Sequence, residues 1–105
     1  MAWIYLFVAG LLEIVWAIGL KHTDGFSRLV PTAVTVTAMI ISVLLLGLSL
    51  KTLPIGTAYA VWSGIGIVGT ALTGILIYGE PADAMRIVCM TMIVAGIAGL
   101  KLLTN

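Results

Sequence analysis

The chain has 105 residues, of which 62% are hydrophobic and only 9% are charged, whereas soluble domains are roughly 25% charged. A soluble protein of this size could not cover its surface with so few polar groups, because a short chain buries only a modest share of its area. The net charge of +1 gives no basic field for nucleic acid, and the single Cys excludes an intramolecular disulfide and any Cys-rich metal site. The composition therefore indicates a small integral membrane protein.

Polar residues fall in clusters that divide the chain into four apolar stretches, at about residues 2–20, 29–50, 55–78 and 84–103. A helix needs roughly 20 apolar residues to cross a hydrocarbon layer about 30 Å thick, so each stretch is long enough. In lipid the backbone must satisfy its own hydrogen bonds, and long stretches without alternation predict helices rather than barrel strands. We therefore predict one all-α domain over residues 1–105, with four transmembrane helices. No Lys or Arg precedes the first stretch and Glu13 interrupts it, so we expect it to be retained rather than cleaved as a signal peptide.

Glu13 lies in the middle of the first predicted span. An acid at this depth costs a few kcal/mol by insertion scales, faces the interior of a helix bundle and by default marks a function. A structural ion pair is the alternative, but every Lys and Arg lies at the end of a span or in a loop. A carboxyl in this place can hold a proton or a cation, but not comfortably both. We therefore predict that Glu13 binds substrate and protons.

Aromatic and hydroxyl side chains share helical faces that can meet Glu13. Trp16 follows Glu13 by three residues, and Tyr59 and Trp62 are spaced by three in the third span. In the second span Thr35, Ser42 and Ser49 recur every seven residues, which places them in one polar stripe. Aromatic faces attract cations and hydroxyls can orient a carboxylate, so these residues suit a small cation site. The alternatives are that the aromatic rings anchor at the membrane interface and that Ser bonds its own helix backbone.

Small residues in the last two spans predict close helix packing. Gly64 and Gly66 form a possible bend in the third span, because freed backbone groups are tolerated in membranes where neighbours satisfy them again. In the fourth span, Ala95, Gly96 and Gly99 form a small patch with small-xxx-small spacing. This spacing favours a helix-packing face between two chains, although packing within one chain would use it equally well.

The distribution of basic residues is compatible with insertion in both orientations, and equally with a single orientation that is fixed by other cues. An even number of spans puts Lys51 and Lys101 on one side of the membrane and Lys21, Arg28 and Arg86 on the other. Two against three is hardly the bias by which basic residues fix orientation. Four helices cannot easily enclose a pathway alone, and inverted repeats around a midplane site are a known transporter architecture. We therefore expect an antiparallel, dual-topology homodimer in which two Glu13 carboxyls meet.

The pattern Gly10-x-x-Glu13-x-x-Trp16 and the segment Leu53–Gly66, with Tyr59-x-x-Trp62 inside it, resemble the small multidrug resistance family over essentially the whole chain. The first pattern resembles the guanidinium exporter branch of that family. Ser63 is a departure, because many guanidinium exporters carry Thr there and Ser also occurs in the drug-exporting branch.

The resemblance implies an antiparallel homodimer in the bacterial inner membrane that exchanges guanidinium or small guanidinyl cations for protons. It implies that Glu13 binds either ion and that four further residues line the site. It also implies that two glycines let each subunit change conformation and that the fourth span forms the dimer contact. The four lining residues are Trp16, Ser42, Tyr59 and Trp62, the hinge is Gly64 and Gly66, and the dimer contact contains Ala95, Gly96 and Gly99.

Three other functions remain open at this stage. A transporter with the same mechanism could export quaternary ammonium or other lipophilic cations, since Glu13 and its aromatic neighbours could bind either kind of cation. A passive cation channel and a structural membrane subunit are alternatives from other classes. An enzyme is not expected, because the single His, His22, lies in a polar segment without a nucleophile or metal-spaced partners. We predict no cofactor, no metal and no nucleic acid partner.

Overall fold

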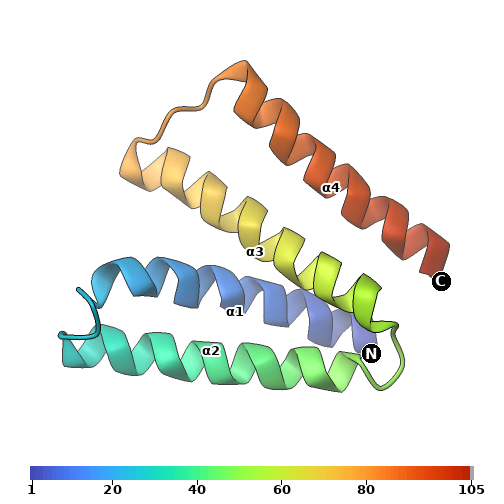
Figure 1. Cartoon of the computed structure of the whole chain (residues 1–105), viewed down its shortest axis with the longest axis horizontal. Helices are drawn as coiled ribbons and strands as arrows, with labels where there is room; N and C mark the ends of the chain where they lie inside the picture. The colour runs from blue at the N-terminus through green and yellow to red at the C-terminus, as the bar shows by residue number, and fades with distance from the viewer. Residues whose placement is uncertain (105) are drawn as a thin grey trace.

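The computed structural model describes residues 1–104 and contains four α-helices in that range, with no strand. They are α1 (Ala2–His22), α2 (Leu29–Ser49), α3 (Ile55–Tyr78) and α4 (Ala84–Thr104), drawn from blue to red in Figure 1. The prediction of an all-helical chain with four long apolar helices is confirmed. His22 is the last residue of α1 rather than part of the following loop.

Helix ends coincide with residues that cannot continue a helix or that satisfy free backbone groups. Thr23 follows α1, donates its hydroxyl to the Leu20 carbonyl oxygen at 2.9 Å and is itself buried. Pro54 precedes α3 in extended conformation, a position where the missing N–H costs little. Gly79 ends α3 at φ 67°, in the left-handed region that glycine adopts without strain. This last turn directs the chain back along α3 before α4 begins.

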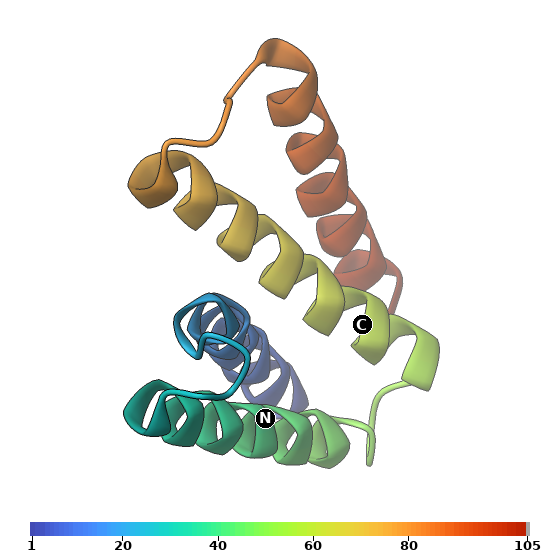
Figure 2. The same cartoon turned by 60° about the vertical axis from the view of Figure 1, so that its left-hand side comes forward.

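The helices form a flat arrangement rather than a closed bundle. Figure 1 shows α1 and α2 running antiparallel side by side, and Figure 2 shows α3 lying between that pair and α4. The Cα atoms extend 42 by 35 Å but only 16 Å in the thinnest direction, so the chain is much thinner than it is long or wide. This flat arrangement leaves large faces of α2 and α4 open.

Those open faces are apolar. Each helix is at least 18 residues long with high mean hydropathy, and at most 28% of its most hydropathic window is buried inside the chain. Water would make such exposure very costly, whereas lipid would not, so the four helices are built to cross a membrane. The chain is a multi-pass membrane protein.

The buried core lies where α1, α2 and α3 meet. Its central residues are Leu6, Ala9, Ala58, Val61 and Trp62. Small residues let the helices approach closely beside it: the space above Gly10 on α1 is filled by Ile65 of α3, and the space above Gly19 by Thr35 of α2. Thr35, Ser42 and Ser49 are all buried, so the hydroxyl stripe predicted on α2 faces inward.

The contact at Gly10 generates a stability prediction. A Cβ on Gly10 would lie 2.7 Å from the Cβ of Ile65, an atom fixed to the α3 backbone that cannot rotate away. We expect Gly10→Ala to lower the free energy of unfolding by about 1–3 kcal/mol, as overpacking usually does, measured by thermal unfolding in detergent. Gly47→Ala is the control, because nothing lies within 4 Å of its added Cβ and helix propensity favours Ala. Equal melting temperatures for the two variants would contradict this packing.

Candidate functional site

Glu13 points from α1 toward α3 in the middle of the protein. Its carboxyl group occupies the space where Gly66 of α3 would carry a side chain, so only glycine at that position leaves room for it. The Oε1 atom is buried and has no hydrogen-bond partner in residues 1–104. The one ion pair in this range joins Arg86 to Asp83, far along the sequence. A buried polar atom nearly always has a partner, so this carboxyl oxygen is available for a ligand or a proton.

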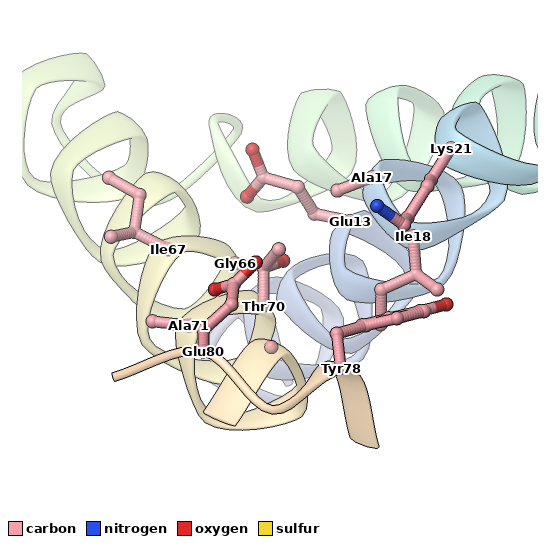
Figure 3. A pocket seen from close by; sticks show the side chains of 11 residues that line it. Glu13, Ala17, Ile18, Lys21, Gly66, Ile67, Thr70, Ala71, Tyr78 and Glu80 are labelled. Atoms are coloured by element: carbon pink, nitrogen blue, oxygen red, sulfur yellow. The ribbon is translucent and has the colours of Figure 1, made fainter. Parts of the chain in front are cut away.

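Glu13 lines a cavity of about 450 Å³ between α1 and α3 (Figure 3). The lining combines this carboxyl with small and apolar residues and with polar side chains toward the far ends of both helices. Its residues are Glu13, Ala17, Ile18 and Lys21 from α1, Gly66, Ile67, Thr70, Ala71, Gly74 and Tyr78 from α3, and Glu80 beyond it. A space of this size and mixed lining can admit a small polar cation.

Two hydrogen bonds hold Ser42 and Trp62 in the buried core between α1, α2 and α3. The Ser42 hydroxyl donates to the Ala9 carbonyl oxygen at 2.7 Å, and the Trp62 indole N–H donates to the Ser42 oxygen at 3.0 Å. Ala9, Ser42 and Trp62 are all buried, so these two hydrogen bonds join α1, α2 and α3 in the core. Ser42 therefore bonds across helices, and the alternative that it bonds only its own helix does not hold.

Tyr59 contacts Trp62, and Trp16 packs against the same buried core. The Tyr59 ring lies 5.6 Å from the Trp62 ring, tilted by 44°, and the residue is 58% exposed on the outer surface of the chain. Trp16 is half-buried against the core, and its indole N–H, like the Glu13 oxygen, is buried without a partner in the described residues. Because it is a donor, that N–H could serve an oxygen acceptor in an occupied site.

These four residues do not line the cavity that contains Glu13. Along the helices, Ala9 and Trp62 lie four residues before Glu13 and Gly66, whereas Trp16 follows Glu13 by three residues. That Trp16, Ser42, Tyr59 and Trp62 line the site therefore remains a prediction.

The predicted hinge and dimer residues have different surroundings. α3 is an unbroken helix through Gly64 and Gly66, where small size admits Ile97 of α4 and the Glu13 carboxyl respectively. A role in bending remains a prediction. On α4, Ala95 and Gly96 are exposed, and nothing lies within 4 Å of a Cβ at Gly96 or Gly99. This patch therefore does not pack within one chain over residues 1–104.

The sequence reasoning missed the polar end of the cavity. His22, which is exposed, and Tyr78 form a hydrogen bond there, with the His22 Nε2 and the Tyr78 hydroxyl 2.6 Å apart. The Lys21 ammonium lies 5.0 Å from the centre of the Tyr78 ring. Lys21 and Tyr78 lie at the C-terminal ends of α1 and α3, which run parallel to each other (Figure 1), so the polar ends of the first and third spans meet.

Comparison with known proteins places the chain in a family. A profile of the family described as Small Multidrug Resistance protein matches residues 1–93. The chain belongs to this family. Relatives named guanidinium exporter occur in Escherichia coli K12, 61% identical over 105 residues, and in Citrobacter freundii, 59% identical over 105 residues, each covering the whole of both chains. The guanidinium exporter of Salmonella typhimurium LT2 is 62% identical over 102 residues, or 97% of each chain. The resemblance noted from Gly10-x-x-Glu13-x-x-Trp16 is confirmed.

The Ser42 bonds give a test of how this small multidrug resistance protein holds its site. Ser42→Ala would leave the Trp62 N–H buried without an acceptor, and we expect a loss of about 1–3 kcal/mol in the free energy of unfolding. Trp62→Phe removes the donor as well, so the double variant should lose less than the sum of the two single losses. Thermal unfolding of the three variants measures this coupling. Additive losses would show that the hydrogen bond contributes nothing to stability.

Proposed function

We propose that this protein exports guanidinium ion, or small guanidinyl cations, in exchange for protons. The proposal depends mainly on the Glu13 carboxyl group, which lies beside Gly66 in an otherwise apolar region. Its Oε1 atom is buried and has no hydrogen-bond partner among the described residues. Full-length relatives at 61% identity are named guanidinium exporters, which supports the substrate. Glu13 is the position where a proton or the cation binds, but not both together.

The site suits guanidinium chemically. A planar cation with N–H donors can form two parallel hydrogen bonds to one carboxylate, the geometry that favours Arg–carboxylate pairs. Trp62, held by Ser42, and Trp16 place aromatic faces one turn away, where they attract a cation. A quaternary ammonium ion has no N–H donors and would use charge and aromatic faces alone.

Competition at Glu13 provides the coupling. When a proton binds on one side of the membrane it displaces the cation, and an inward proton gradient then drives the cation outward. The proposal assigns positioning to Trp16, Ser42, Tyr59 and Trp62, and conformational exchange to Gly64 and Gly66. Alternating access at a midplane site completes the cycle.

The working unit in this proposal is an antiparallel homodimer in the bacterial inner membrane. The Cα atoms of one chain extend only 16 Å in the thinnest direction, and the cavity beside Glu13 is lined by α1, α3 and Glu80. The α4 patch of Ala95, Gly96 and Gly99 is open in the single chain and offers the small-residue surface on which helices approach closely in membranes. Nearly balanced basic residues on the two sides favour insertion both ways round.

Transport currents test the substrate directly. In proteoliposomes on a solid-supported membrane, guanidinium jumps should give currents that respond to a pH gradient, and Glu13→Gln should abolish them because Gln can neither release a proton nor balance a cation. Tetraethylammonium jumps run alongside. Currents for the bulky ion with little for guanidinium would assign the protein to drug export. Guanidinium currents insensitive to pH would indicate a channel. Silence for both ions, with no guanidinium-driven proton flux on a pH-sensitive dye, would indicate a structural role.

Competition also predicts a pH dependence of binding. Protonated Glu13 cannot balance guanidinium, so apparent affinity should fall as pH is lowered, by up to about tenfold per pH unit for each proton displaced. Isothermal titration of the protein in detergent with guanidinium over several pH values measures this slope. An affinity that is constant with pH would contradict competition.

Dual insertion can be measured in intact cells. With Cys89→Ala as background, Ser27→Cys places one thiol on the exposed α1–α2 loop and Thr52→Cys places one on the exposed α2–α3 loop. An impermeant maleimide should label about half of the copies of each variant, because the charge bias that fixes orientation is nearly absent. Permeabilised cells give the total. Complete labelling of one variant and none of the other would exclude the antiparallel dimer.

A further inference from the structure

The mouth of the Glu13 cavity contains a second carboxylate, Glu80. Gly79 turns the chain through a left-handed conformation, and the Glu80 backbone N–H then donates to the Gly74 carbonyl oxygen at 3.1 Å. This turn folds the Glu80 carboxyl back against α3, where it fills the space that a side chain on Gly74 would need. Figure 3 shows the side chain lying with Thr70 and Ala71 at the cavity wall.

The position of this carboxylate is electrostatically unusual. Gly74 lies in the last turn and a half of α3, and the carbonyl end of a helix favours cations and disfavours anions. Within residues 1–104 Glu80 has no ion pair and no side-chain hydrogen bond, whereas Asp83 on the same loop pairs with Arg86. The carboxylate and the helix end therefore add their negative potentials at the cavity mouth, and a bound cation would relieve both.

Three α3 residues connect this mouth to Glu13. Gly66, Thr70 and Gly74 follow one another at four-residue intervals, so they lie on one face of the helix. Glu13 fills the space above Gly66, and Glu80 fills the space above Gly74. Between them the buried Thr70 hydroxyl has no partner in the described part of the chain. The two glycines are separated by eight residues, or about 12 Å along the axis.

We propose that Glu80 is a second binding position for the guanidinium cation, from which the ion passes along Thr70 to Glu13. This inference rests on the proposed function and adds a residue to it. The carboxylate attracts the cation at the cavity mouth, and the Thr70 oxygen accepts an N–H bond on the way. Glu80 thus raises the local cation concentration and lowers KM, without taking part in proton exchange at Glu13.

Lys21 opposes Glu80 in the same cavity. Its ammonium lies over the Tyr78 ring, 5.0 Å from the centre, and the Tyr78 hydroxyl is held by His22. The Lys21 ammonium is placed over the Tyr78 ring and forms no ion pair with Glu80 in residues 1–104. Removing the Lys21 charge should therefore strengthen cation attraction, so the two residues have opposite expected effects on KM.

The test is guanidinium transport current in proteoliposomes as a function of guanidinium concentration. We expect Glu80→Gln to raise KM about threefold or more, in the range of one exposed charge contact, with the maximal current and its response to pH unchanged. Lys21→Met should lower KM. Gly74→Ala should act like Glu80→Gln, because the added Cβ displaces the flexible Glu80 carboxyl from the cavity wall.

Asp83→Asn is the matched control, since this carboxylate lies on the same loop but pairs with Arg86 and does not line the Glu13 cavity. An unchanged KM in Glu80→Gln would overturn the inference, and so would an equal rise in Asp83→Asn, which would indicate only general surface charge. Absence of current in the unaltered protein would instead overturn the proposed function. The two failures are therefore distinguishable.

Discussion

A carboxyl group packed against a glycine in the middle of an apolar chain is the constraint on which the rest of this structure depends. Glu13 can occupy its place only because Gly66 has no side chain. Within residues 1–104 no basic side chain forms an ion pair with it. An acid at this depth in a membrane protein is costly and by default marks a functional site.

The arrangement holds α1 firmly and leaves the cavity side open. The bonds from Trp62 to Ser42 and from Ser42 to Ala9 fix α1 against α2 and α3 one turn from Glu13. Gly10 allows the same close approach on the α3 side. On the other side of Glu13, α1 and α3 line a cavity that ends in polar residues. Glu13 thus lies between a closely packed core and a space that could admit an ion, as the proposed function requires.

Much of this could be predicted from the sequence, because membrane helices are specified by length and apolar composition. Glu13 and the Ser42 stripe were visible as polar residues at interior positions. Glu80 could not be recognised, because its approach to the cavity depends on the left-handed turn at Gly79 and the absent side chain of Gly74. The pairing of His22 with Tyr78 likewise depends on how far α1 and α3 extend beside each other. The antiparallel dimer remains a prediction, since it involves a second chain.

The central claim is that guanidinium and protons exchange at Glu13. The most direct measurement loads proteoliposomes with guanidinium and a pH-sensitive dye, clamps the membrane potential to zero, and dilutes them into buffer without guanidinium at the same pH. The account predicts that the lumen acidifies as guanidinium leaves, and that Glu13→Gln abolishes the signal. Loss of guanidinium from the liposomes with no change in lumenal pH would contradict it.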